Sequence, residues 1–309
     1  MASNIKPKLM KPTTHKLCFT IFALAAALLL PARTDAHPGS GIVVDRQGNI
    51  YFVDTGGGVF KIGRSGRLSR VQGPAYPWMA IDLDGKLKDV KMPYFSSGDA
   101  TVTMVGEDPA LILSSDFPVV VGRDGSLYYP WYRDRLEVFR LNPSGQTSVL
   151  VTLPDTTESG PLRWLNGVAA GPDGSIYYSE NRAMRKISPQ GRLITVANSI
   201  SLTGCASIPG MDGHLGPNLR SLDIDSSGNV FVAASGCGRV LKITADGQVT
   251  SILSATSPWS PTGVAVSGKD LYVLEYLHTV GDNRREWLPR VRKLSADGSV
   301  STVAEIKER

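Results

Sequence analysis

Residues 167–194 read GVAAGPDGSIYYSENRAMRKISPQGRLI, and this stretch decides the fold. It holds a run of alternating small apolar residues, a Pro-Asp-Gly turn, a second alternating run, a basic and apolar run, and a Gly turn that leads into a further run. Each run is about five residues long, which suits a β-strand, and each break carries turn residues. The stretch therefore predicts a series of short strands joined by tight turns.

The pattern repeats along the chain. Clear copies cover residues 41–71, 118–151, 222–253 and 263–303, the last with an insertion. A degenerate copy fits between residues 72 and 117, where Trp78-Met-Ala-Ile-Asp-Leu-Asp-Gly85 matches the first strand and turn. Six units of about 45 residues each have the length of four-stranded propeller blades. We predict an all-β, six-bladed β-propeller with four-stranded antiparallel blades at about 40–71, 76–113, 117–153, 164–197, 219–254 and 261–304.

The N-terminus is typical of a secretory signal. A front segment with Lys6, Lys8, Lys11 and Lys16 precedes an apolar stretch, Leu17 to Leu30, and small residues follow. We predict a signal peptide over residues 1–36 and a mature propeller over 37–309, with cleavage after Ala36 or, as an alternative, after Ala32. The localisation expected is secreted or periplasmic, with no membrane span after cleavage. An uncleaved anchor is the other interpretation, although Leu17 to Leu30 is short for a span.

Removing this segment changes the charge of the protein. The whole chain carries 33 Lys and Arg against 28 Asp and Glu, a formal net charge of +5. Residues 1–36 hold five of the basic and one of the acidic residues, which leaves a mature net charge of +1. The basic balance therefore belongs largely to the targeting segment, and we expect no nucleic-acid partner.

The repeat resembles a known group of propellers. The pattern G-[VI]-[AV]-[VA]-D-x-x-G-[NS]-[ILV]-[YF]-[VF]-x-[DE], followed by V-x-K-I, is similar to that of NHL-repeat six-bladed propellers. It also resembles the gluconolactonase/SMP-30-like, paraoxonase-like and streptogramin-lyase propellers. One scaffold hosts many activities, so the resemblance implies the fold more strongly than the function.

The topology of such blades defines two faces. Strand A lies nearest the central channel, so the D–A and B–C loops share one face, called here the long-loop face, and the short A–B and C–D turns share the other. Variable loops on a rigid scaffold commonly carry binding sites. The candidate ligand-binding residues on the long-loop face are Trp78, Trp131, Arg133, Trp164, Asn166, Asn181, Arg220, Trp259 and Tyr276. They suit a small molecule, a glycan or a peptide, whereas the alternative is that the Trp rings fill gaps between blades.

The resemblance to gluconolactonases can be examined residue by residue. It is strongest in Leu165-Asn-Gly-Val168 and in Val230-Phe-Val-Ala233. The divalent cation of that family, Ca²⁺ or Zn²⁺, implies a Glu, an Asn and an Asp; Asn166 matches, but Arg220 stands at the Asp position and Gly39 or Ser40 at the Glu position. Glu180 is a replacement ligand to consider. Otherwise Asn166 caps a turn, and Arg220 serves either an anionic ligand or a structural carboxylate pair.

A lyase is the other enzyme class to consider. The resemblance to streptogramin lyases implies a His and a Glu on the same face, for proton abstraction. The candidate catalytic residues are Glu180, His214, Glu275 and His278. A His in a long loop is also commonly a solvated side chain with no catalytic role.

Two cysteines remain after signal cleavage, Cys205 in a D–A loop and Cys237 in the B–C loop of the same blade. An oxidising compartment and an even count favour a disulfide between them, and two free thiols are the alternative. We expect a monomeric exported binding or scaffold module that presents its long-loop face to a ligand. The alternative function is a lactonase-type hydrolase or a lyase that uses the same face.

Overall fold

The computed structural model describes residues 39–54, 57–73, 78–81, 87–88, 111–114, 118–132, 134–154, 166–205, 216–279 and 286–308. The chain divides into two compact units, Met1–Asp35 and Ala36–Arg309, and the first lies outside the described residues. No helix within the described ranges is long and apolar enough to cross a bilayer.

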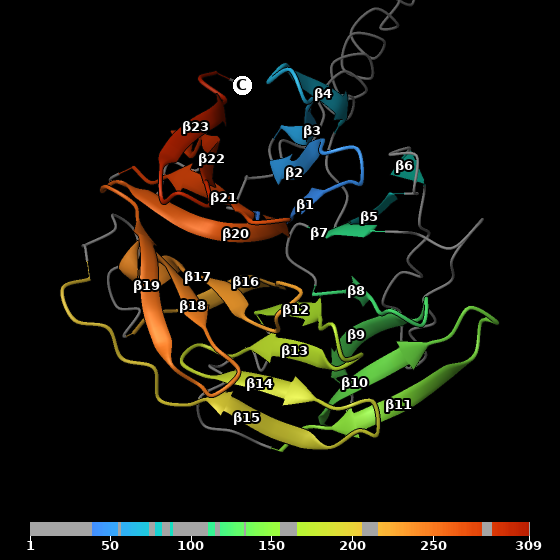
Figure 1. The fold of residues 1–309 in the computed structure, drawn as a ribbon. Helices are drawn as coiled ribbons and strands as arrows, with labels where there is room; N and C mark the ends of the chain where they lie inside the picture. Colours follow the sequence, from blue (N-terminus) through green and yellow to red (C-terminus); the bar gives the residue numbers. More distant parts are fainter. Residues whose placement is uncertain are drawn as a thin grey trace, which may run out of the picture. The chain divides into compact units, whose positions relative to one another are not determined.

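The second unit is an all-β propeller of four-stranded antiparallel blades (Figure 1). The first blade consists of β1 (Ile42–Val44), β2 (Ile50–Asp54), β3 (Gly58–Ile62) and β4 (Leu68–Gln72). The next four-stranded blade consists of β8 (Val120–Val121), β9 (Leu127–Tyr132), β10 (Leu136–Leu141) and β11 (Thr147–Thr152). Another consists of β12 (Gly167–Ala170), β13 (Ile176–Ser179), β14 (Met184–Ile187) and β15 (Leu193–Ala197). The last two are β16 (Leu219–Ile224), β17 (Val230–Ala234), β18 (Arg239–Ile243), β19 (Val249–Ser254), and β20 (Trp259–Ser267), β21 (Asp270–Leu277), β22 (Pro289–Leu294), β23 (Val300–Glu305). A single 3₁₀ turn, η1 (Ser235–Cys237), separates β17 from β18 among the described residues.

The prediction of six four-stranded blades is wrong in number, because the described residues form five. The segment expected to give another blade, 76–113, contributes a three-stranded sheet of order β6-β5-β7. Its strands are β5 (Trp78–Ile81), β6 (Leu87–Lys88) and β7 (Leu111–Ser114). The expected first strand, at Trp78, is the middle strand, and the late apolar run Leu111–Ser114 lies beside β1 and β8 instead. This copy lacks the regular strand and turn alternation of the others, so its sequence does not fix the order of its strands.

The inner strands form a closed ring. Following contacts between neighbours, β1 meets β20, and β16, β12, β8 and β7 follow in turn until β7 meets β1 again (Figure 1). The first and last four-stranded blades therefore close the ring by packing against each other. Their shared core contains Phe52 and Ile62 from one blade and Leu274 and Val291 from the other.

Hydroxyl groups tie neighbouring blades together near the inner strands. Ser235 Oγ donates to the Pro261 carbonyl at 2.6 Å, and Ser260 Oγ donates back to the Ser235 carbonyl at 2.8 Å. At the closing junction, Thr262 Oγ1 donates to Gly39 O at 2.7 Å. Gly263 allows this approach, since a Cβ there would lie 2.4 Å from Ser40 O. These bonds join a hydroxyl of one blade to a backbone carbonyl of the next.

The short turns are built by one repeated device. Asp45 accepts the backbone N–H and the side-chain amide of Asn49, each at 2.7 Å, and Asp225 does the same for Asn229. The intervening Gly48 and Gly228 adopt φ values of 80° and 81°, which favour glycine. The aspartates on this face therefore hold turns together, as their D-x-x-G-N spacing suggests.

Candidate functional site

The long-loop face lies where strands A begin and strands B end. Of the residues that the sequence places there, Arg133, Trp164 and His214 lie outside the described residues, as does the side chain of Trp78. Trp131 is half-buried at the end of β9, where it lies opposite Glu137. Two aromatic candidates apart, the remaining candidates form three groups around the inner strands.

The first group consists of Asn166, Asn181 and Arg220. The Asn166 amide nitrogen donates to Asn181 Oδ1 at 3.0 Å and to the Leu219 carbonyl at 2.8 Å. Ser179 Oγ donates to the Arg220 carbonyl at 2.7 Å. The backbone of Arg220 is thus fixed beside Asn166 across a blade junction, as the sequence suggests for these two residues.

The second group contains the two candidate glutamates, and arginines neutralise both. Glu180 is 5% exposed, and its Oε2 lies 3.4 Å from Arg185 Nε. Glu275 is fully buried; it pairs with Arg290 Nε at 2.7 Å and also with Arg292 Nη2. Sequence reasoning missed these arginines, although each stands in the next strand of the same blade.

Two aromatic candidates serve the packing of the blades. The guanidinium of Arg290 lies 3.9 Å from the centre of the Trp259 ring, in a cation–π arrangement. Tyr276 is fully buried and donates its hydroxyl to the Val53 carbonyl at 2.8 Å, across the closing junction of the ring. Trp259 therefore stacks on an arginine of its own blade, and Tyr276 joins the first and last four-stranded blades.

The third group is His278 with its surroundings. The side chain is 3% exposed, and neither ring nitrogen has a hydrogen-bond partner among the described residues. Its ring centre lies 4.8 Å from that of Trp287. Burial and, in the same direction, the nearby positive charge of Arg220 together lower the pKa of His278 to about 4. The imidazole is therefore neutral at physiological pH.

Cys205 and Cys237 form a disulfide, with Cα atoms 4.4 Å apart. The bridge joins the loop that precedes β16 to η1, so it ties two loops of one blade on the long-loop face. Arg239 reinforces the same loop, because its Nη2 donates to the Gly204 carbonyl at 2.9 Å.

The described residues at this face do not fit a divalent cation. Among them, no group of three or more His, Cys, Asp or Glu side chains lies close enough to hold an ion. The candidate ligand Glu180 is paired with Arg185. Arg220 adds a further positive charge at the position where the resemblance implies an Asp.

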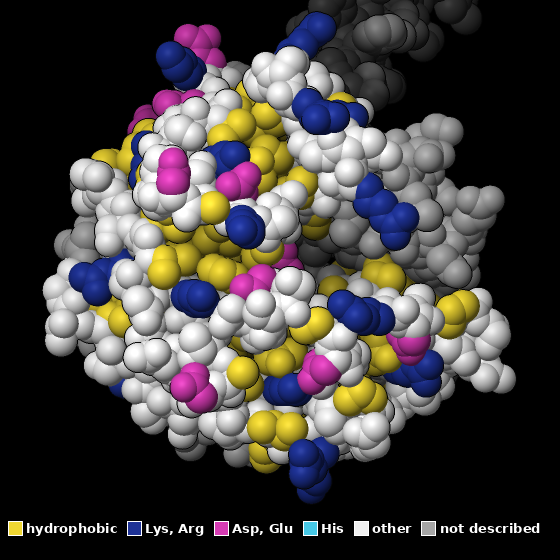
Figure 2. All heavy atoms as spheres, viewed as in Figure 1, with side chains coloured by type: hydrophobic (Ala, Val, Ile, Leu, Met, Phe, Trp, Pro, Cys, Tyr) yellow, Lys and Arg dark blue, Asp and Glu magenta, His cyan; other side chains and the backbone are white. Residues whose placement is uncertain are grey.

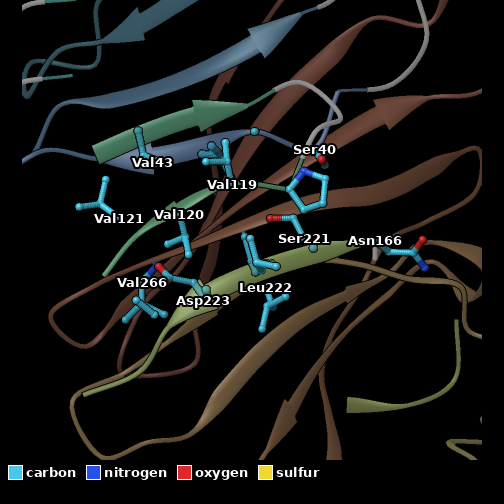
Figure 3. Close-up of a pocket in the computed structure, with 18 of the residues that line it drawn as sticks. Ser40, Val43, Val119, Val120, Val121, Asn166, Ser221, Leu222, Asp223 and Val266 are labelled. Atoms are coloured by element: carbon cyan, nitrogen blue, oxygen red, sulfur yellow. The ribbon is translucent and has the colours of Figure 1, made fainter. Parts of the chain in front are cut away.

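A cavity of about 280 Å³ runs between the inner strands β1, β8, β12, β16 and β20 (Figure 3). Ser40 and Asn166 lie at one end of it, toward the long-loop face, and Asp223 and Val266 lie at the other. Between them the walls are mostly valine, alanine and isoleucine. Figure 2 shows one face of the molecule, which is hollowed near its centre and carries basic and acidic side chains interspersed.

Among the described residues that line this cavity, Asp223 is the only one with an ionisable side chain, and sequence reasoning did not single it out. Its Oδ2 accepts the Val266 N–H at 2.7 Å, and its Oδ1 accepts the Ile224 N–H at 2.8 Å. Burial raises the pKa of Asp223 to about 6, although the two backbone donors act in the opposite direction. The repeat offered a signal: the equivalent positions of other inner strands are Val43, Ala169 and Ala265. A carboxylate in that series departs from the pattern.

No protein-family model and no curated protein matches the chain. Solved structures do. A virginiamycin B lyase from Staphylococcus aureus, a catalytically inactive histidine-to-alanine variant with quinupristin, is 14% identical over 88% of this chain and 85% of that one, with a TM-score of 0.51. Regucalcin from Agrobacterium tumefaciens, described as a calcium-binding protein, is 17% identical over 90% and 93%, with a TM-score of 0.54. A gluconolactonase from Xanthomonas campestris is 16% identical over 77% and 84%, with a TM-score of 0.51. At these identities the likeness establishes a shared propeller fold.

Proposed function

We propose that this protein is an exported binding module that takes a small anionic molecule on its long-loop face. The observation that carries the proposal is the place of Arg220 beside Asn166, where a cation-dependent relative would be expected to hold an Asp. A guanidinium offers five donors in a planar fork, which suits a carboxylate. The neighbouring amides of Asn166 and Asn181 add polar groups that can orient such a ligand.

Glu180 and Glu275 are both paired with arginines, which favours a binding function over metal-assisted hydrolysis. A hydrolase that activates water with a divalent cation needs carboxylates that converge on the ion. Here Glu180 and Glu275 are buried and face arginines within their own blades. Both glutamates are therefore committed to pairs within their own blades.

Calorimetric titration of the mature protein tests this proposal. Gluconate is the probe, and glucose is its neutral counterpart. We expect gluconate to bind and glucose to bind at least about tenfold more weakly, since a charge-assisted pair is lost. The variant Arg220→Gln should lose gluconate binding, whereas Arg192→Gln, the same charge change next to a short turn on the other face, should keep it. Tight binding of Ca²⁺ or Zn²⁺ by the wild type, or equal binding of gluconate by both variants, would overturn the proposal.

A second candidate function, a lyase, is favoured by His278. A neutral imidazole without a hydrogen-bond partner can accept a proton, and the adjacent Arg220 can stabilise the negative charge that forms on the substrate. The quinupristin complex among the solved structures suggests quinupristin as the test substrate. A product formed by the wild type and absent with His278→Asn would support the lyase. No cleavage by the wild type, measured together with intact gluconate binding, would leave the binding function alone.

We also propose export. The basic and apolar residues 1–36 motivate a cleaved signal peptide, and the Cys205–Cys237 disulfide is compatible with an oxidising compartment. An intact mass that retains residues 1–36 after export would contradict this proposal.

A further inference from the structure

The central cavity is charged at one end and apolar along its walls, and the proposed function does not involve this arrangement. One end holds a single carboxylate, Asp223, and the walls between the ends are apolar (Figure 3). Among the described residues that line the cavity from β1, β8, β12, β16 and β20, Asp223 is the only one with an ionisable side chain. Its charge therefore has no counter-charge among those lining residues.

We propose that this cavity binds an aliphatic primary ammonium ion, with the ammonium on Asp223 and the hydrocarbon chain along the valines. Asp223 Oδ1 and Oδ2 each accept one backbone N–H, and a carboxylate has about four acceptor sites, so both oxygens retain capacity. An ammonium group brings three donors and the opposite charge. Val43, Val120, Val121 and Val266 provide the apolar contact for the chain.

The size of the cavity narrows the class of ligand. A volume of about 280 Å³ lies at the small end of the range for ligand pockets, so it suits a short chain better than a sugar or peptide. The far end, with Ser40, Asn166 and Ser221, has hydroxyl and amide groups and no charge. It would accept a terminal hydroxyl more readily than a second ammonium.

The fixed position of Asp223 prepares the site for the ligand. The bond from Val266 N–H holds the carboxylate between β16 and β20, so little side-chain freedom is lost when an ammonium binds. Because Asp223 is the only ionisable group among the described residues that line the cavity, the affinity should rise between pH 5 and pH 7.5 as its carboxylate ionises. The ammonium itself stays charged over this range.

Titration calorimetry with the full mature protein tests the inference, with n-hexylammonium as the probe. Hexanol lacks the charge and inorganic ammonium lacks the chain, and we expect each to bind at least about tenfold more weakly. Asp223→Asn should lose hexylammonium binding, because asparagine keeps the shape of the side chain but removes its charge. Val121→Phe should also lose it, because the ring fills part of the cavity and leaves the carboxylate in place.

Two outcomes would overturn the inference. Equal affinity for inorganic ammonium and hexylammonium would mean that contact between the apolar walls and the hydrocarbon chain adds nothing to the affinity. Unchanged binding in both variants, each confirmed as folded by circular dichroism, would place the ammonium outside the cavity. Gluconate binding is measured in parallel, so a failure of this inference is distinct from a failure at Arg220.

Discussion

Replacing Glu275 by glutamine should destabilise the propeller strongly, because it leaves two arginines without their shared anion. Glu275 is fully buried, and the side chains of Arg290 and Arg292 are only 15% and 13% exposed. In the native protein the two guanidinium groups and one carboxylate form a compact network across β21 and β22. Glutamine keeps the shape and one acceptor oxygen but removes the charge.

The magnitude follows from the burial of the network. Removing one partner of a buried ion pair typically costs about 3–5 kcal/mol, because the remaining charge stays desolvated. The partial exposure of the two arginines allows some water to reach them, so we expect a loss near the lower end, about 3 kcal/mol in the free energy of unfolding. Guanidinium or urea unfolding of the oxidised mature protein measures it, with an unchanged slope as the check that the transition remains two-state.

Lys186→Gln is the matched control, because it also removes one charge from an ion pair. Lys186 lies 2.5 Å from Asp173, with side chains 22% and 46% exposed. Exposed pairs contribute about 0–1 kcal/mol, so this variant should unfold close to the wild type. If Glu275→Gln is as mild as Lys186→Gln, the network contributes little and the reasoning from burial is wrong.

Three further predictions concern titration and cross-linking. Because the pKa of His278 falls to about 4 in the folded protein, the unfolded state binds the proton first as the pH falls below 6.5. The free energy of unfolding should therefore drop by about 3 kcal/mol as the pH falls from 6.5 to 4. His278→Asn should abolish that part of the pH dependence in unfolding measurements. Asp223 should change stability with pH in the opposite direction, since its raised pKa of about 6 makes the folded state bind the proton first. The free energy of unfolding should decrease by about 3 kcal/mol as the pH rises from 4 to 6, and comparison with Asp223→Asn isolates this contribution. The double variant Cys205→Ala, Cys237→Ala should lose about 3–4 kcal/mol by the chain-entropy model for a separation of 32 residues, and equal thermal midpoints would contradict it.

The sequence predicts the architecture because the repeat encodes it locally. Each copy carries alternating apolar residues that become buried strands, and a Gly at positive φ that closes each short turn, as at Gly48 and Gly228. The blade count was wrong where this local code fails. Between residues 72 and 117 the runs Trp78–Ile81 and Leu111–Ser114 are both apolar, so nothing in the sequence tells which of them takes the inner position.

The site was less predictable, because its contacts join residues far apart in the chain. The sequence brings Asn166 and Arg220 to one junction. There the Asn166 side-chain amide donates to the Leu219 carbonyl, and Ser179 Oγ donates to the Arg220 carbonyl. It does not reveal that Tyr276 is committed to the Val53 carbonyl, or that burial keeps His278 neutral. Those properties depend on packing between blades, which periodicity does not record.

Comparison of the blades with one another separates structural from functional charges on the long-loop face. The paired register makes Glu180 equivalent to Glu275, and Arg185 equivalent to Arg292. In the blade that begins with β16, Ala234 and Leu241 occupy these two positions, and in the blade that begins with β8, Trp131 and Phe139 do. The glutamate and the arginine are present together or absent together in these four blades, as expected for a pair that stabilises its own blade.

The first blade departs from that rule, because Asp54 takes the position of the glutamate while Phe60, not an arginine, takes the position of Arg185. His278 and Arg220 likewise have no counterpart that the repeat requires. Since a repeated pair is explained by packing, the candidates for function are the charges that the repeat does not explain. Experiments on activity should therefore begin with Arg220 and His278, while Glu180 and Glu275 are better measured by the free energy of unfolding.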